Sequence, residues 1–191
     1  MLPEKIIFVG VLINLFCSLW YIKNIFHGGI KPNLVSWFMW MLAPFFGFFF
    51  MIQAGTGLSA LPVFMAGFSS LLIFIFSILH KNAYWKINNF DLICGLISLT
   101  SLILYVFTHN LGISILFAII SDSLAYIPTI IKSWKFPETE SSSTYVGGLI
   151  SNALSMLIIK NWIFSIYSFN ISILIMNLVV IFCIYRKKIF K

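Results

Sequence analysis

Seven apolar stretches, separated by short polar links, follow one another along this sequence. They cover about residues 6–22, 34–52, 60–79, 90–107, 111–131, 144–159 and 165–185. A helix that crosses a bilayer needs about 20 mostly apolar residues, with a usable range of about 17–25. The first stretch follows Lys5 as a signal peptide would, but no small-residue cleavage site comes after it. The pattern predicts an all-α membrane protein with seven transmembrane helices.

The composition requires an apolar surface. Hydrophobic residues make up 61% of the chain and charged residues 9%, whereas a soluble domain carries about 25% charged residues. Such a chain cannot cover itself with a polar surface, so its expected surroundings are the lipid bilayer. The 191 residues suit one compact bundle and leave no room for a second soluble domain.

The net charge of +7 does not indicate nucleic-acid binding. Basic residues sit singly at predicted helix ends and in a short tail, where anionic lipid headgroups explain them. With seven spans, two of the twelve Lys and Arg residues fall on the side of the N-terminus and ten on the other side. The positive-inside rule therefore predicts an N-terminus outside and a C-terminus in the cytoplasm, in the cell (inner) membrane.

The chain also repeats itself weakly. An offset of 108 residues, the difference between positions 14 and 122, places the first three predicted helices on the last three. It pairs Asn14 with Asp122 and Ser69 with Asn177. We therefore expect a three-helix repeat over residues 1–80, a linker helix over 81–110 and a second repeat over 111–191. An odd linker makes the two repeats parallel, in a 3-1-3 arrangement.

Two segments carry a resemblance to a known superfamily. Residues 122–152 contain a helix with Pro128 near its end, a basic turn and a Ser/Thr-rich start to the next helix. Residues 31–40 look like its counterpart in the first repeat. With the 3-1-3 layout, these segments resemble the SWEET and PQ-loop membrane proteins, and are similar to uncharacterised bacterial seven-helix members. Thr129 stands where the Pro-Gln pair of PQ-loop proteins has its glutamine.

The resemblance implies a carrier whose two three-helix bundles rock about a central solute site. Pro44 and Pro128 match two of the four hinge prolines of SWEET carriers, and Trp20 and Asn152 stand at the other two positions. Asn177 matches an asparagine with which such carriers hold a substrate. Related members include sugar uniporters, vitamin-precursor carriers, proton-coupled amino-acid exporters and retrieval receptors, so the fold does not select the cargo.

Asp122 lies deep inside an apolar stretch. An acid at mid-membrane depth costs about 2.5–3.5 kcal/mol on insertion scales, and marks a functional site by default. In the functional interpretation, Asp122 binds a cation or an amine of the substrate, or takes up a proton during transport. In the structural interpretation, its side chain is hydrogen-bonded to Tyr126, Asn14 or Asn152. We favour the functional interpretation because intramembrane acids more often line a pathway.

Three asparagines lie near the middle of predicted spans, where an amide needs a partner across a helix interface or in a wet cavity. With the acid, they place polar groups in the first, fifth, sixth and seventh helices. Trp40 shares a helical face with Pro44 and could stack on a solute, whereas Trp37 is expected to be a headgroup anchor. The predicted substrate site is Asp122, Asn14, Asn152, Asn177, Trp40, Ser69 and Tyr126, with Pro44 and Pro128 as hinges.

No pattern in the sequence indicates catalysis. The motifs G-x-S-x-G and H-E-x-x-H are absent, and the three cysteines are isolated within apolar runs. We therefore expect neither an enzyme nor a bound cofactor or metal. The function predicted is transport of a small polar solute, and a homodimer is compatible with it. The alternative is a non-transporting receptor or accessory subunit, which would hold its polar side chains bonded to one another in a dry core.

Overall fold

The computed structural model describes residues 3–80, 85–107 and 110–189, and this part of the chain is helical with no strand. Its seven α-helices are α1 (Ile6–Phe26), α2 (Leu34–Gln53), α3 (Leu61–Leu79), α4 (Asn89–Val106), α5 (Leu111–Lys135), α6 (Ser143–Ile158) and α7 (Phe164–Ile189). Two short 3-10 turns, η1 (Gly57–Ala60) and η2 (Pro137–Thr139), lead into α3 and α6. The predicted all-α fold with seven helices is confirmed.

Three helices continue four residues past their predicted ends at positions 22, 131 and 185. These are α1, α5 and α7, which end at Phe26, Lys135 and Ile189. Each carries basic residues in its last turn. Positive charge is favourable at a helix C-terminus, and long basic side chains reach the membrane surface from inside it. Helical structure therefore extends beyond the apolar run by which the ends were predicted.

Five spans are long and apolar enough to cross a membrane: α1, α2, η1 with α3, α5 and α7. Helices α4 and α6 contain shorter apolar segments. The 16 residues of α6 rise about 24 Å at 1.5 Å per residue, less than the roughly 30 Å of a bilayer core. Large apolar side chains are nevertheless exposed along the helices, including Phe16 at 70% and Leu96 at 64%. This is the surface of a multi-pass membrane protein.

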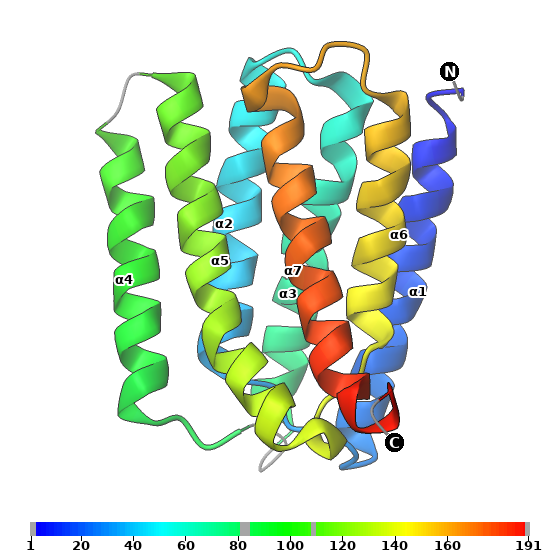
Figure 1. The fold of residues 1–191 in the computed structure, drawn as a ribbon, viewed down its shortest axis with the longest axis vertical. Helices are drawn as coiled ribbons and strands as arrows, with labels where there is room; N and C mark the ends of the chain where they lie inside the picture. The colour runs from blue at the N-terminus through cyan, green and yellow to red at the C-terminus, as the bar shows by residue number, and fades with distance from the viewer. Residues whose placement is uncertain (1–2, 81–84, 108–109, 190–191) are drawn as a thin grey trace.

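The helices stand side by side along the long axis of the molecule, with the chain ends at opposite ends of the bundle (Figure 1). We call these the N-terminal end and the C-terminal end of the bundle. Helix α3 packs against α1 and α2, and α7 packs against α5 and α6. The two largest contacts between these groups are those of α1 with α6 and of α2 with α5. Helix α4 lies at the edge and packs on α5 and α2.

Asparagine caps begin two of these helices, and a glycine allows one of the close contacts between helices. Asn33 begins α2 by accepting hydrogen bonds from the backbone N–H of Val35 and Ser36, and Asn110 begins α5 in the same way. At Gly147 on α6, an added β-carbon would lie 2.7 Å from Cβ of Cys17 on α1. Glycine therefore allows the close approach of α6 to α1.

Candidate solute-binding site

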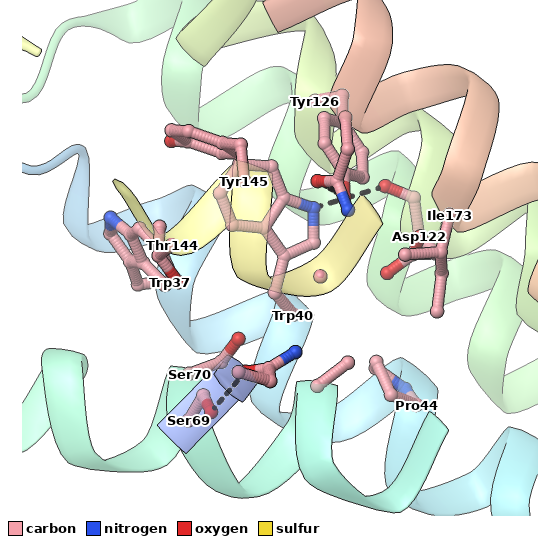
Figure 2. Close-up of a pocket in the computed structure, with 14 residues that line it drawn as sticks. Trp37, Trp40, Pro44, Ser69, Ser70, Asp122, Tyr126, Thr144, Tyr145 and Ile173 are labelled. Atoms are coloured by element: carbon pink, nitrogen blue, oxygen red, sulfur yellow. Dashed lines mark hydrogen bonds between the residues drawn. The ribbon is translucent and has the colours of Figure 1, made fainter. Parts of the chain in front are cut away.

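A small cavity of about 40 Å³ lies in the interior between α1, α2, α3, α5, α6 and α7 (Figure 2). Asp122 follows the start of α5 by eleven residues, about 17 Å at 1.5 Å per residue, so the cavity is near the middle of the bundle. Six of the seven predicted substrate residues line it, together with one predicted hinge. These are Asn14, Trp40, Ser69, Asp122, Tyr126, Asn177 and Pro44.

Two of the predicted site and hinge residues lie elsewhere. Asn152 on α6 does not line the cavity; its Nδ2 donates to the backbone oxygen of Gly148 at 2.8 Å. Gly148, one turn earlier on α6, lines the cavity in its place. Pro128 is buried within α5 but outside the cavity lining. The part of α6 that reaches the cavity is therefore one turn nearer the C-terminal end of the bundle than the position of Asn152 predicted.

The carboxylate of Asp122 is buried without a partner. Its residue is 1% exposed, and Oδ2 has no hydrogen-bond partner among the described residues. The backbone oxygen of Asp122 accepts a hydrogen bond from Trp40 Nε1 at 3.4 Å. Within residues 3–80, 85–107 and 110–189, no lysine, arginine or histidine lines the cavity. An unpaired charge in such surroundings is costly, so this carboxylate is available for a proton or a cation.

The expected structural partners of Asp122 bond to other groups. The hydroxyl of Tyr126 donates to Oδ1 of Asn177 at 3.1 Å. Oδ1 of Asn14 accepts from Ser69 Oγ at 2.9 Å and from Ser18 Oγ at 3.3 Å. Each amide thus keeps its place through a neighbouring hydroxyl, while the acid stays free.

Four aromatic rings form a wall of the cavity, those of Trp37, Trp40, Tyr126 and Tyr145. The centroids of Trp40 and Tyr126 are 4.3 Å apart, and those of Trp37 and Trp40 are 5.0 Å apart. Tyr145 lies 6.2 Å from both tryptophans. The expectation that Trp37 anchors at the headgroups is wrong, because its side chain is 3% exposed and points inward.

Sequence reasoning also missed Tyr145 and Thr144 as lining residues. The signal was the internal offset, which pairs Tyr145 with Trp37 and Thr144 with Ser36. Both members of the second pair bond across to another helix. Ser36 Oγ accepts from Thr129 Oγ1 at 3.0 Å, and Thr144 Oγ1 lies 3.1 Å from Ser18 Oγ.

A buried ion pair lies at the C-terminal end of the bundle. Nζ of Lys132 on α5 lies 2.6 Å from Oε2 of Glu140, and both side chains are almost fully buried. The same Nζ donates to the backbone oxygen of Lys31 at 2.6 Å, and the Tyr21 hydroxyl donates to Oε1 of Glu140. We call these four residues the latch. It ties α1 and the link after it to α5 and the link before α6.

The opposite half of the bundle contains polar groups that the protein leaves unsatisfied. Oδ1 of Asn152 and of Asn170, and Oγ of Ser151, are buried without a partner in the described part of the chain. Ser155 Oγ donates to the backbone oxygen of Ser59 at 2.6 Å. Ser59 in turn lines a second pocket, of about 200 Å³, near the N-terminal end. Buried groups of this kind normally bind ordered water.

Glu4 and Lys160 line this second pocket and form an ion pair, with Oε1 and Nζ 2.5 Å apart. Both side chains are about half exposed or more, so the pair contributes at most about 1 kcal/mol. The two ends of the bundle therefore differ in their ion pairs, because that of the N-terminal end is exposed and that of the C-terminal end is buried.

Comparison with known proteins adds nothing to this geometry: no family model, no curated protein and no solved structure matches the chain.

Proposed function

We propose that this protein is a multi-pass membrane carrier that moves a small polar solute by alternating access about the central cavity. The observation that carries the proposal is the carboxylate of Asp122, buried without a partner in the wall of a cavity at mid-bundle. A carboxylate without a partner is costly in a purely structural core, whereas ionisable groups at this depth mark solute and proton pathways.

The helix contacts support a 3-1-3 arrangement with an axis along the membrane normal. Among these six helices, exchanging α1, α2 and α3 for α5, α6 and α7 turns each major contact into another that is present. The contact of α1 with α6 becomes that of α5 with α2, and the contact of α1 with α3 becomes that of α5 with α7. We therefore propose two three-helix repeats, residues 1–80 and 111–191, with α4 between them in the chain.

Four residue pairs of the 108-residue offset converge on the cavity. They are Asn14 with Asp122, Trp37 with Tyr145, Trp40 with Gly148, and Ser69 with Asn177. A solute site between parallel repeats lies on their common axis, so equivalent positions meet there. Pro44 and Pro128, in α2 and α5, remove one helix hydrogen bond each and are proposed as hinges.

The unequal ends support one half of an alternating-access cycle. The latch is buried at the C-terminal end, whereas the N-terminal end has a second pocket of about 200 Å³ and an exposed ion pair. The distribution of basic residues favours a cytoplasmic C-terminal end. We propose that the conformation is closed toward the cytoplasm of a cell (inner) membrane, and that the latch opens when the repeats rock.

The second candidate function is a receptor or accessory subunit that does not transport. The cavity favours it in one respect, since about 40 Å³ holds only a few waters in this conformation. Uptake by proteoliposomes tests the two against each other. A carrier accumulates one solute class and is saturable, and the Asp122→Asn variant is slower. Purified protein that neither binds nor moves any sugar, amine or vitamin precursor would support the receptor or accessory role.

A further inference from the structure

The charged groups around the cavity determine whether a bound solute should be an anion or a cation. In the part of the chain that the structure describes, Oδ2 of Asp122 is buried without a partner and the cavity wall contains no basic side chain. The nearest buried cation in sequence, Lys132, is already held by Glu140 and by the backbone oxygen of Lys31. An anionic solute would meet an uncompensated carboxylate, whereas a cation would supply the missing partner.

The aromatic wall favours the same charge. Trp40 lies 4.3 Å from Tyr126 and 5.0 Å from Trp37, centroid to centroid. The indole N–H of Trp40 is engaged with the backbone oxygen of Asp122. Its π system can still attract a cation within about 6 Å, because the face of an aromatic ring is negative. A carboxylate beside aromatic rings is the chemistry that binds ammonium groups in proteins.

The volume and the remaining acceptors distinguish among cations. About 40 Å³ admits a group of roughly the size of water, and a primary ammonium head is such a group. It carries three N–H donors. Asp122 Oδ2 is unpartnered, and Oδ1 of Asn177 accepts one hydrogen bond, from Tyr126, where an amide oxygen can accept two.

We propose that the cavity binds the primary ammonium group of a small organic solute, with the Asp122 carboxylate as counter-ion and the rings of Trp40 and Tyr126 as its wall. This inference rests on the proposed carrier function and names its substrate class. It assigns Asp122 to cargo binding rather than to proton transfer.

The test compares ethanolamine with ethylene glycol near neutral pH, where ethanolamine is an ammonium and the two differ mainly in that group. Purified protein is titrated with each, and binding is followed by tryptophan fluorescence, since Trp37 and Trp40 line the cavity, and by the rise in melting temperature. Ethanolamine should bind and ethylene glycol should not. Asp122→Asn should weaken ethanolamine binding about tenfold or more while the protein remains folded.

Asp91→Asn is the matched control, because it neutralises another buried acid outside the cavity. Asp91 at the start of α4 accepts from the backbone N–H of Asn88 at 3.0 Å, and the variant should bind ethanolamine as the wild type does. Equal binding of ethylene glycol, or binding insensitive to Asp122→Asn, would overturn the inference. So would sodium ions stabilising the protein through Asp122 when ethanolamine does not.

Uptake separates this inference from the proposed function. Proteoliposomes that accumulate a neutral solute but not ethanolamine would overturn the ammonium assignment and leave the carrier standing. Ethanolamine that binds through Asp122 without being moved would leave the ammonium site standing and refute the carrier.

Discussion

At the scale of single residues, α6 and α7 approach one another because position 148 has no side chain. A β-carbon at Gly148 would lie 2.6 Å from Nδ2 of Asn177 and 3.7 Å from Nδ2 of Asn14. Both asparagines line the cavity, so a single methyl group would displace an amide from its wall. Asp122 differs from these asparagines, because its Oδ2 has no hydrogen-bond partner among the described residues.

Replacing Gly148 by alanine should alter the site more than the fold. We expect a loss of about 1–3 kcal/mol in the free energy of unfolding, typical of overpacking, together with weaker binding of any solute that contacts Asn177. Gly29→Ala is the control, since the nearest atom to its added β-carbon is 3.7 Å away. Thermal unfolding and ligand titration of both variants check this. A Gly148→Ala protein with unchanged binding would place the solute away from α7.

Asp122→Asn should leave the unliganded protein as stable as the wild type or more stable. The carboxylate has no partner to lose, and a buried acid without one costs up to about 3 kcal/mol. Thermal unfolding in detergent without added amine measures the change. A large loss of stability in this variant would instead identify Asp122 as a structural acid.

At the scale of elements, the link before α6 is attached to the rest of the bundle by buried charge. Glu140 contacts Lys132 at 2.6 Å and also accepts from Tyr21. Lys132 and Glu140 both belong to the second proposed repeat, and the Tyr21 hydroxyl and the backbone oxygen of Lys31 join this pair to the first. Conversion to a form open at this end requires Tyr21 and Lys31 to separate from the pair, so these two contacts of the latch are the ones that movement must break.

Glu140→Gln should destabilise the protein by about 3 kcal/mol, because it leaves the Lys132 ammonium buried without a counter-charge. Replacing both partners, as Lys132→Met with Glu140→Leu, should cost less than the sum of the single changes. A double-mutant cycle by thermal unfolding measures that coupling. Glu138→Gln, an exposed acid in the same link, is the control and should have little effect. If the effects of the single changes are additive, the side chains of Lys132 and Glu140 have no coupling energy and the pair does not stabilise the link.

At the scale of the whole molecule, the chain ends lie at opposite ends of the bundle (Figure 1). In the membrane the two ends should therefore face different compartments. Asn161, between α6 and α7, and Lys187, in the last turns of α7, are exposed and mark these two ends.

Single cysteines at these two positions test the topology. In a background without Cys17, Cys94 and Cys183, a membrane-impermeant maleimide should label Asn161→Cys in intact cells. It should label Lys187→Cys only after the membrane is permeabilised, because the basic end is expected to be cytoplasmic. Labelling of both positions, or of neither, in intact cells would contradict a crossing of the membrane by α7, the helix between them.

The helices were predictable from the sequence because long apolar runs have few stable alternatives in lipid. Their C-terminal ends were less predictable: α5 continues to Lys135 because basic residues are favourable in a last turn. The offset between positions 14 and 122 predicted which polar positions could meet. It could not place Asn152 outside the cavity, since residues one turn apart share a helix face but differ by about 5.4 Å in level, and the packing of α6 on its neighbours sets which level meets the cavity.

What the sequence determined by itself is the class of the protein and the identity of its polar intramembrane residues. Both follow from the absence of water in the bilayer, which makes every buried polar group expensive and therefore conspicuous. Only the tertiary structure decided how those groups are satisfied. In it, Asn14 accepts a hydrogen bond from Ser69, Asn177 accepts one from Tyr126, and Lys132 pairs with Glu140. Oδ2 of Asp122 has no partner among the described residues. Partner choice depends on distances of about 3 Å between different helices, which no spacing along one chain can specify.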